Sequence, residues 1–117
     1  MTILIVDDDH IARIIIEQRL KQLSIQEGFT SAENGQKAME YMRERGVPDI
    51  IFLDINMPVM NGFDVLKAME QEGMVSKVYM VTSSMLDTDK SEAEQFENVK
   101  GFYQKPFDAE HIKEIFA

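Results

Sequence analysis

The chain contains no cysteine, which excludes disulfides, thiolate nucleophiles and sulfur-ligated metal sites. Its two histidines, His10 and His111, are too few for a His-rich zinc cluster, so any bound metal is expected to be a hard cation held by oxygen atoms. No apolar run reaches the roughly 18 residues that a membrane-spanning helix needs. No basic segment leads into an apolar stretch near residue 1. We therefore expect a cytoplasmic protein with no membrane partner.

Positive charge is also scarce. The chain carries 12 Lys and Arg against 21 Asp and Glu, a formal net charge of −9. Binding to nucleic acid phosphates needs clustered cations, so direct nucleic acid binding by this chain is not expected. Cations and basic partners suit this surface better, although an acidic surface also keeps a protein soluble without any specific partner.

The length and composition predict one globular domain. A chain of 117 residues buries about 65% of the surface that it exposes when unfolded. With 44% hydrophobic and 28% charged residues, it is neither disordered nor fibrous in composition. We expect a single domain over residues 1–117.

Short apolar runs alternate along the chain with segments of helical periodicity. Strands are expected over 2–6, about 27–32, 49–53, 77–82 and 101–104. The first helix is expected over 11–23, with Asp9 as its N-cap. The second is expected around 38–42 and ends at 46, and the third is expected around 65–69 and ends near 73. The fourth is expected over about 89–97, and the last includes 112–116 and runs to the chain end. Because the strand segments read as solid apolar runs, the sequence predicts an α/β fold with a parallel sheet covered on both faces.

Polar side chains gather where the predicted strands end. In open parallel sheets, ligands bind beyond the carboxyl ends of the strands. Those positions hold acids after the first and third strands, hydroxyls after the fourth and a lysine after the fifth: Asp7, Asp8, Asp9, Asp54, Thr82, Ser83 and Lys105. The sequence therefore predicts one polar site at one edge of the sheet.

This set of groups suits a divalent cation and a phosphoryl group. Two carboxylates 4 Å apart repel by about 4 kcal/mol at an effective dielectric constant of about 20, so a neutralising ion is needed. Oxygen ligands alone select Mg²⁺, Mn²⁺ or Ca²⁺, and Mg²⁺ commonly combines one or two carboxylates with a phosphate oxygen. Lys105 and Thr82 would face that phosphate, and Asp54 is placed to attack phosphorus and form an aspartyl phosphate. Taken alone, an acid pair such as Asp7 and Asp8 is more often a helix-capping pair than a metal site, and the other groups expected at the same edge favour the metal site.

Four segments together resemble the response regulator receiver domain, the phosphoacceptor module of bacterial two-component signalling, chemotaxis regulators included. They are Ile-Leu-Ile-Val-Asp-Asp-Asp at 3–9, Leu-Asp-Ile-Asn-Met-Pro-Val-Met-Asn-Gly at 53–62, Val-Thr-Ser-Ser at 81–84 and Lys-Pro-Phe at 105–107. The resemblance covers the whole chain. It implies a flavodoxin-like doubly wound (βα)5 fold, with a five-stranded parallel sheet in the order 2-1-3-4-5 and helices on both faces.

The resemblance also implies the metal ligands. Asp54 would be the phosphorylated residue, and Mg²⁺, or Mn²⁺ in its place, would be held by Asp7, Asp8, Asp54 and the backbone carbonyl of Asn56. The phosphoryl group would contact Thr82, Ser83, Lys105 and Asn56, with Asp54, Lys105 and Thr82 as the catalytic set. The peptide bond between Lys105 and Pro106 is expected to be cis.

A switch pair follows from the same resemblance. In such domains the hydroxyl at the Thr82 position moves toward the phosphoryl group, and an aromatic side chain on the fifth strand rotates into the vacated space. Three residues before Lys105, that aromatic is Phe102. Many relatives carry tyrosine there, so any output contact that depends on its hydroxyl is absent from this chain.

The first predicted helix carries two isoleucines outside its core face. At 100° per residue, Ile11 and Ile14 point away from the face formed by Ala12, Ile15, Ile16, Leu20 and Leu23. In the family this helix docks the four-helix phosphodonor domain, so we expect Ile11 and Ile14 to form an apolar docking patch. Scattered surface apolar residues are an equally good interpretation.

The function expected from these features is a phosphoacceptor switch of a two-component phosphorelay. A histidine kinase or phosphotransfer protein would pass its phosphoryl group to Asp54 with Mg²⁺, and the shape change would alter binding to an output protein. Catalysis would be limited to the chain's own phosphorylation and dephosphorylation. No effector domain is expected in this chain, which is either a stand-alone receiver or a receiver cut from a longer regulator or hybrid kinase.

Other functions on the same fold stay open. A pseudo-receiver would act as a phosphorylation-independent binding scaffold. A flavin-binding protein is disfavoured because acids follow the first strand, where they would repel an anionic phosphate. A phosphatase that forms an aspartyl phosphate is disfavoured because Ile-Asn follows Asp54, where such enzymes place a second acid.

Overall fold

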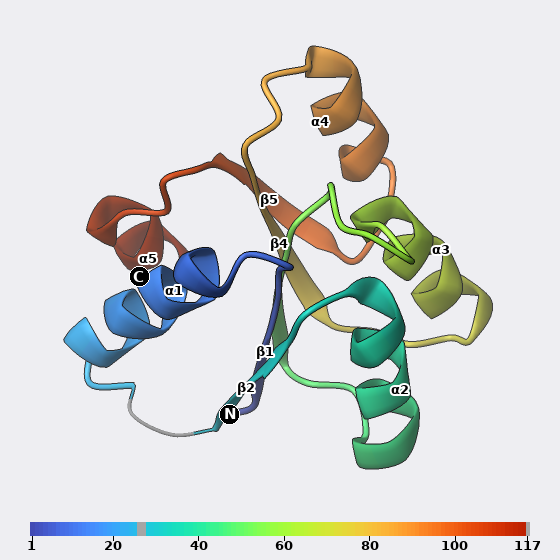
Figure 1. The fold of residues 1–117 in the computed structure, drawn as a ribbon, viewed down its shortest axis with the longest axis horizontal. Helices are drawn as coiled ribbons and strands as arrows, with labels where there is room; N and C mark the ends of the chain where they lie inside the picture. Colours follow the sequence, from blue (N-terminus) through green and yellow to red (C-terminus); the bar gives the residue numbers. More distant parts are fainter. Residues whose placement is uncertain (26–27, 117) are drawn as a thin grey trace.

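The computed structural model describes residues 1–25 and 28–116, and in that part of the chain five strands alternate with five helices (Figure 1). The strands are β1 (Ile3–Val6), β2 (Phe29–Ala32), β3 (Ile50–Leu53), β4 (Lys77–Thr82) and β5 (Val99–Gln104). The helices are α1 (His10–Gln22), α2 (Gly35–Arg45), α3 (Gly62–Gln71), α4 (Asp87–Glu94) and α5 (Ala109–Phe116). Glu27 and Ala117, which the sequence patterns placed in the second strand and the last helix, lie outside the described residues.

The strands form one sheet in the order β2-β1-β3-β4-β5, and each neighbouring pair is parallel. This confirms the predicted flavodoxin-like topology. Every residue of β1 and β3 is buried, as the solid apolar runs of both segments predict for strands covered on two faces. The two central strands therefore hold the residues that follow them, Asp7 and Asp54, at the same edge of the sheet.

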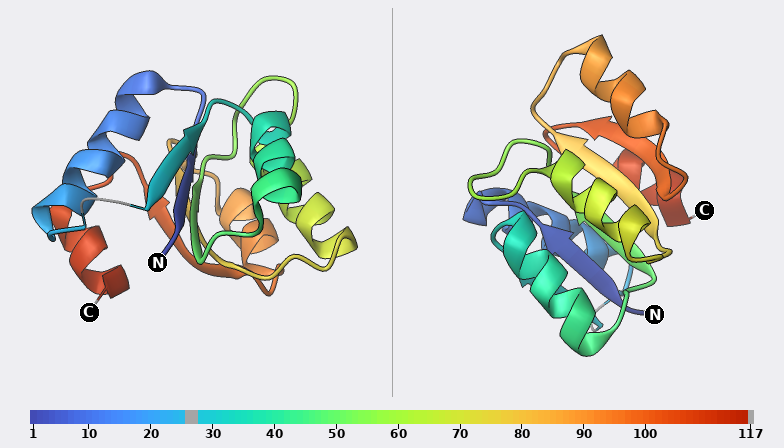
Figure 2. Two further views of the ribbon diagram at one scale, coloured as in Figure 1. Left: turned by 90° about the horizontal axis from the view of Figure 1, so that it is seen from below. Right: turned by 90° about the vertical axis from the view of Figure 1, so that its right-hand side faces the viewer.

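Helices cover both faces of the sheet. Figure 2 shows α1 and α5 on one side and α2, α3 and α4 on the other. Successive side chains of a strand point to opposite faces, so Ile3 and Ile5 of β1 pack under α1 and α5 while Leu4 and Val6 pack under α2 and α3. The fold thus has two apolar cores separated by the sheet.

Side-chain caps begin three of the helices at the carboxyl edge of the sheet. Asp9 accepts a hydrogen bond from the Ile11 backbone N–H, confirming the predicted N-cap of α1. Asn34 and Asn61 cap α2 and α3 in the same way. These caps set where each loop ends and so fix the length of the loops that carry the acidic residues.

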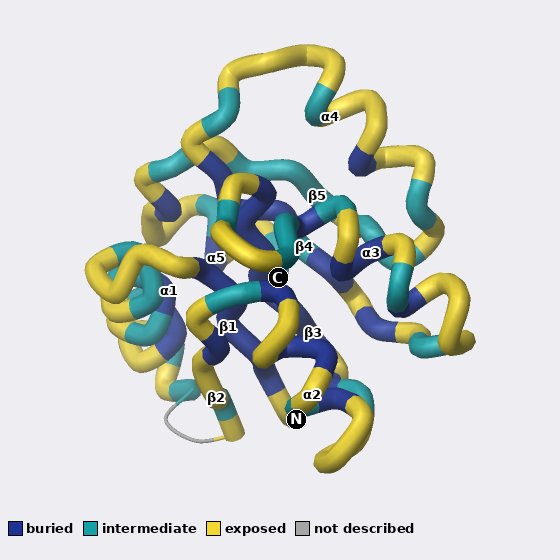
Figure 3. The backbone as a smooth tube through the Cα atoms, turned by 45° about the vertical axis from the view of Figure 1, so that its right-hand side comes forward, coloured by how far each residue is buried: buried dark blue, intermediate teal, exposed yellow. Residues whose placement is uncertain are grey.

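The region around α4 differs from the sequence prediction. The helix begins at Asp87 and ends at Glu94, whereas the pattern predicted about 89–97. The helix ends early because the Asn98 side chain holds the turn that leads into β5. This side chain donates to the Met74 carbonyl at 2.9 Å and accepts from the Ser76 N–H. In Figure 3, α4 is exposed over most of its length, with Ala93 as its buried residue.

Strand β5 starts at Val99, two residues earlier than predicted. A register shift between β4 and β5 interrupts the alternation of side chains that marks a strand in a sequence. Val78 pairs with Val99, while the next residue, Tyr79, pairs with Gly101. A Cβ on Gly101 would lie 2.8 Å from the Tyr103 ring, so a larger residue at this position would require that side chain to shift.

The lengths of the helices agree with the absence of long apolar runs. Within residues 1–25 and 28–116, none of the helices combines the length and the hydropathy required to cross a membrane.

Candidate functional site

The first component of the site is the loop between β1 and α1. Asp7 follows β1 directly and is 1% exposed, whereas Asp8 is exposed to solvent. The Asp7 carboxylate accepts a hydrogen bond from the Asp9 N–H at 2.9 Å, and the Arg13 guanidinium donates to the Asp7 carbonyl at 2.6 Å. The carboxylate and the carbonyl of Asp7 are therefore both held by hydrogen bonds.

The second component is the end of β3. Asp54 is 5% exposed, and its Oδ1 accepts a hydrogen bond from the Ile55 N–H at 2.8 Å. The loop that follows folds back tightly, since the Gly62 N–H donates to the Ile55 carbonyl at 2.8 Å. A Cβ on Gly62 would lie 2.3 Å from the Asp54 carbonyl oxygen, so only glycine allows this close approach.

The acidic residues converge at this edge. Asp7, Asp8 and Asp54 each place a carboxylate oxygen within 4.8 Å of the others. Lys105, from the loop after β5, inserts its ammonium group among them: Nζ lies 2.7 Å from Asp7 Oδ2 and 3.4 Å from Asp54 Oδ2. Four of the predicted strand-end residues, Asp7, Asp8, Asp54 and Lys105, thus lie close together across three separate loops.

Burial and charge act in opposite directions on this cluster. Burial raises the pKa of Asp7, and the charge of Asp54 adds to that effect, although the ammonium group of Lys105 and the hydrogen bond from the Asp9 N–H oppose it. For Lys105, burial acts to lower the pKa, but the close contact with the Asp7 carboxylate and the charge of Asp54 outweigh it and the pKa is raised. Lys105 is therefore a fixed positive charge between two acids.

The donor set fits a hard divalent cation. Three carboxylates from two loops offer oxygen ligands alone, and one oxygen, Asp7 Oδ2, is buried with no partner that meets hydrogen-bond geometry within the described residues. This oxygen forms an ion pair with Lys105 Nζ at 2.7 Å. Such a buried, incompletely satisfied carboxylate oxygen beside two further carboxylates is the arrangement expected of a Mg²⁺ site.

The other expected phosphoryl-binding residues lie at the ends of β3 and β4 or in the loops that follow them. Thr82 is the last residue of β4 and is fully buried, and its carbonyl accepts a hydrogen bond from the Lys105 N–H at 2.8 Å. Ser83 and Asn56 are exposed in the loops after β4 and β3. The peptide bond between Lys105 and Pro106 is cis, as the resemblance implied.

The expected switch aromatic lies on β5, beside the end of β4. Phe102 is half-buried and pairs with Met80 in the sheet register. Together with Ser84 and Leu86 it lines a hollow of about 210 Å³. Open space therefore adjoins the ring on the side of the loop that follows Thr82.

The two isoleucines of α1 are exposed, as their helical positions predicted. Ile11 is 61% exposed and Ile14 is 36% exposed. Ile11 also lines an apolar groove of about 280 Å³ between α1 and the loop after β5, which Pro106 and Lys105 line from the other side. Ile14 is not among the lining residues of that groove. The two side chains thus share the helix surface, but only Ile11 borders the groove that leads to Lys105.

Two contributing residues were missed by sequence reasoning. Arg13 anchors the Asp7 carbonyl, and its position one turn after Asp9 on the first helix is the signal that could have found it. Asp89 hydrogen-bonds Ser84 in the loop after β4, but the pattern read it only as a charge at the start of a helix. Contacts of this kind depend on loop geometry that residue spacing does not encode.

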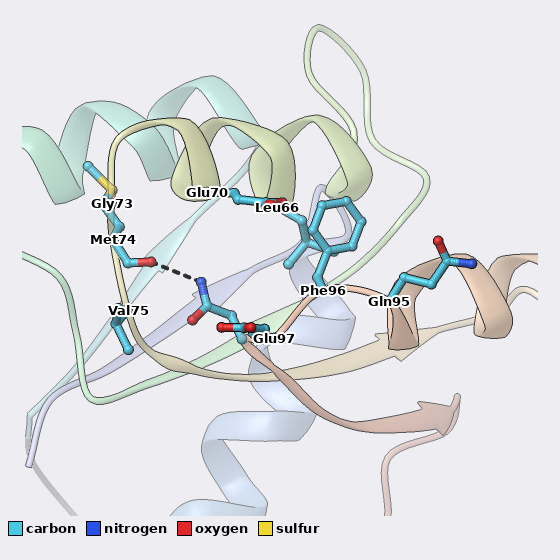
Figure 4. A pocket seen from close by; sticks show the side chains of 9 residues that line it. Leu66, Glu70, Gly73, Met74, Val75, Gln95, Phe96 and Glu97 are labelled. Carbon is cyan, nitrogen blue, oxygen red and sulfur yellow. Dashed lines mark hydrogen bonds between the residues drawn. The ribbon is translucent and has the colours of Figure 1, made fainter.

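A further cavity, of about 290 Å³, lies at the opposite edge of the sheet (Figure 4). It sits between the ends of α3 and α4, with Leu66 and Phe96 among its apolar lining. The dashed line in Figure 4 is the structural hydrogen bond from Asn98 to the Met74 carbonyl. Its carboxylates, Glu70 and Glu97, are both exposed, so the cavity holds no buried charged group like those of the acidic edge.

Comparisons with known proteins agree with this geometry. The model of the response regulator receiver domain matches residues 3–117. The chemotaxis protein CheY of Bacillus subtilis is 34% identical over 115 residues, covering 96% of this chain and 91% of that protein. The sensor kinase/phosphatase LuxN of Vibrio harveyi is 39% identical over 70 residues, which cover 60% of this chain and 8% of that protein.

Solved structures show the same fold. The chemotaxis protein CheY4 of Vibrio cholerae superimposes with a TM-score of 0.82 and 26% identity, covering 98% of this chain and 94% of that one. Since the family model spans nearly the whole sequence, this chain belongs to the response regulator receiver domain family.

Proposed function

We propose that this chain is a phosphoacceptor switch in which Asp54 receives a phosphoryl group from a histidine kinase or a phosphotransfer protein. The observation that carries the proposal is the position of Lys105 Nζ, 3.4 Å from Asp54 Oδ2, inside a cluster of three carboxylates. An ammonium group among acids on a rigid sheet edge is the arrangement that phosphoryl transfer requires, since positioning and charge stabilisation supply most of its catalysis.

Each side chain has a distinct task in the transfer. An Asp54 carboxylate oxygen forms the new P–O bond while the P–N bond of the donor phosphohistidine breaks and its electron pair returns to the imidazole nitrogen. Lys105 and the Thr82 hydroxyl neutralise and hydrogen-bond the phosphoryl oxygens. The Ile55 N–H holds Asp54 in place through its Oδ1 atom. Ser83 and Asn56, exposed at the rim, complete the contacts to the phosphoryl group.

Mg²⁺ would be held by Asp7, Asp8, Asp54 and the Asn56 carbonyl, with Mn²⁺ as a substitute. The ion supplies positive charge that offsets the repulsion between the carboxylates and the incoming phosphoryl group. Asp7 is placed for this by the Asp9 N–H and by Arg13, which fix its backbone and one carboxylate oxygen.

The phosphodonor would dock on α1. Ile11 borders the apolar groove that ends at Lys105, so a helical domain seated on Ile11 and Ile14 would bring its phosphohistidine to the edge that holds Asp54. Phosphorylation would then shift Thr82 and Phe102, change the surface around α4 and β5, and so alter binding to an output protein. Catalysis by the chain would be limited to gain and loss of its own phosphoryl group.

Intact-mass measurement after incubation with acetyl phosphate tests the proposal. The wild-type chain is expected to gain one phosphoryl group in the presence of Mg²⁺ and none after chelation. Asp54→Asn, which keeps the acceptor for the Ile55 N–H, is expected to gain none, whereas Asp87→Asn, an exposed acid on α4, behaves as wild type. No gain by the wild-type chain would instead support a phosphorylation-independent scaffold.

A further inference from the structure

A short chain of hydrogen bonds connects the phosphoryl-binding edge to α4. The Ser84 N–H donates to Thr82 Oγ1 at 3.2 Å, and the Ser84 hydroxyl donates to Asp89 Oδ2 at 2.5 Å. The Leu86 N–H in turn donates to the Ser84 hydroxyl oxygen at 3.3 Å. Ser84 thus holds Thr82 on one side and the first turn of α4 on the other.

The first turn of α4 lacks the kind of side-chain cap that begins three of the other helices. Asp9, Asn34 and Asn61 cap α1, α2 and α3, but the N-cap residue of α4 is Leu86, which makes no side-chain cap hydrogen bond. In place of a cap, the Ser84 hydroxyl links the Leu86 N–H, which donates to it, to the Asp89 carboxylate in the first turn, which accepts from it.

Packing contributes little at the same place. The buried residue of α4, Ala93, lies at the other end of the helix. The residues that lead into the first turn, Met85 and Leu86, are 82% and 62% exposed. A helix start with few buried contacts opens readily when its hydrogen bonds are lost.

We propose that Ser84 and Asp89 are positioning residues that couple the Thr82 hydroxyl to the order of the first turn of α4. The inference rests on the proposed function, in which Thr82 contacts the phosphoryl group. Within the described residues, the hydrogen bond that Thr82 Oγ1 makes is the one from the Ser84 N–H. Turning the hydroxyl to another staggered position, toward Asp54, takes Oγ1 away from that N–H.

The coupling acts in both directions. Release of the Ser84 N–H frees the loop that holds Leu86 and Asp89, so phosphorylation loosens the first turn of α4. Conversely, a chain whose first turn is already loose spends no free energy on opening it and binds the phosphoryl group more tightly. This second effect distinguishes coupling from a merely structural role, since a simply destabilised site would bind more weakly.

Hydrogen exchange of the α4 segment is the first test. The amides of Asp89 and Lys90 both donate to the Leu86 carbonyl and report on the first turn. Exchange there is expected to rise roughly 2- to 12-fold in Ser84→Ala and in Asp89→Ala, the range given by one net hydrogen bond. Asp89→Asn keeps an acceptor for the Ser84 hydroxyl and is expected to stay near wild type.

The matched control is Asp87→Ala. It removes the same charge from the same exposed turn, but Asp87 makes no hydrogen bond to Ser84 among the described residues. Circular dichroism checks that each variant is folded, and the pair of Asp89 variants keeps the test decisive if Ser84→Ala does not fold.

The second test uses beryllofluoride, a stable mimic of a phosphoryl group on a carboxylate, with Mg²⁺ and the whole chain. Fluorine NMR measures its affinity. Binding to the wild-type chain is expected to speed exchange at the first turn of α4. Ser84→Ala and Asp89→Ala are expected to bind roughly 2- to 12-fold more tightly than Asp87→Ala, with no further change in exchange.

The outcomes separate the two proposals. If the wild-type chain binds beryllofluoride but the exchange of α4 does not change, the coupling is wrong and the proposed function stands. Equal behaviour of Asp89→Ala and Asp87→Ala also overturns the coupling. If the wild-type chain neither binds beryllofluoride nor gains a phosphoryl group, the proposed function fails and the coupling falls with it.

Discussion

The ammonium group of Lys105 lies closer to Asp7 than to Asp54: Nζ is 2.7 Å from Asp7 Oδ2 and 3.4 Å from Asp54 Oδ2. The lysine thus does two tasks that conflict. It neutralises the carboxylate that a cation would bind, and it faces the carboxylate that would carry the phosphoryl group. A divalent cation bound by Asp7 would neutralise that carboxylate and would leave the lysine to contact the phosphoryl group alone.

Replacing Lys105 separates these tasks. Lys105→Met leaves two buried carboxylates without their cation, so the free energy of unfolding without Mg²⁺ is expected to fall by about 1–3 kcal/mol. Labelling of Asp54 by acetyl phosphate is expected to slow at least tenfold. Urea denaturation and intact mass measure both effects. Lys100→Met, an exposed lysine on β5, is the control, and a similar loss in it would show that the effect is not specific to the site.

The Asp7 carboxylate is expected to destabilise the fold at neutral pH. Because burial raises its pKa above the ordinary value of 3.8, the folded protein holds the proton more tightly than the unfolded chain does. Stability from this group is therefore present at low pH and lost as pH rises through the folded-state pKa. Asp7→Asn is expected to raise the free energy of unfolding at pH 7 by roughly 1–3 kcal/mol.

The pH dependence of this gain is the decisive measurement. The difference between Asp7→Asn and wild type in urea denaturation without Mg²⁺ is expected to shrink as the pH is lowered through the folded-state pKa of Asp7, because the wild-type carboxyl then becomes neutral too. Asp87→Asn, an exposed acid on α4, should show no such trend. A gain that is constant from neutral to acidic pH would contradict the origin assigned to it.

Much of the fold follows from residue patterns along the chain. The solid apolar runs of β1 and β3 indicate strands covered on both faces, as in the centre of a parallel sheet. In the structure every residue of both strands is buried. The acids that follow these runs then had to lie at one edge, so the position of Asp7 beside Asp54 was predictable. The order of the five strands came from the resemblance of four segments to a family, since alternation alone does not determine it.

What could not be predicted depends on contacts between loops. The early end of α4 follows from the hydrogen bonds of Asn98 to Met74 and Ser76, residues more than twenty positions away. The early start of β5 follows from a register shift that places Gly101 under the Tyr103 ring. Local propensity carries no signal for either, because the partners come from other parts of the chain.

The exposed acid Asp8 gives the cleanest test of the cation site. It lies within the carboxylate cluster but is not buried, so Asp8→Asn is expected to change the free energy of unfolding without Mg²⁺ by less than about 1 kcal/mol. In wild type, Mg²⁺ at 100 times its dissociation constant is expected to add about 2.7 kcal/mol. Asp8→Asn is expected to lose most of this gain, as urea denaturation with and without Mg²⁺ would show.

The α1 patch predicts a separation between two phosphodonors. Ile11 and Ile14 are exposed and do not belong to the carboxylate cluster. Replacing both with serine is therefore expected to leave labelling by acetyl phosphate unchanged. Transfer from a phosphorylated histidine phosphotransfer domain is expected to fall at least tenfold, because that donor must bury the patch to reach Asp54. Val59→Ser and Val75→Ser, exposed apolar residues on other loops, are the controls. Unaltered transfer from the protein donor would show that the two isoleucines are scattered surface residues and not a docking site.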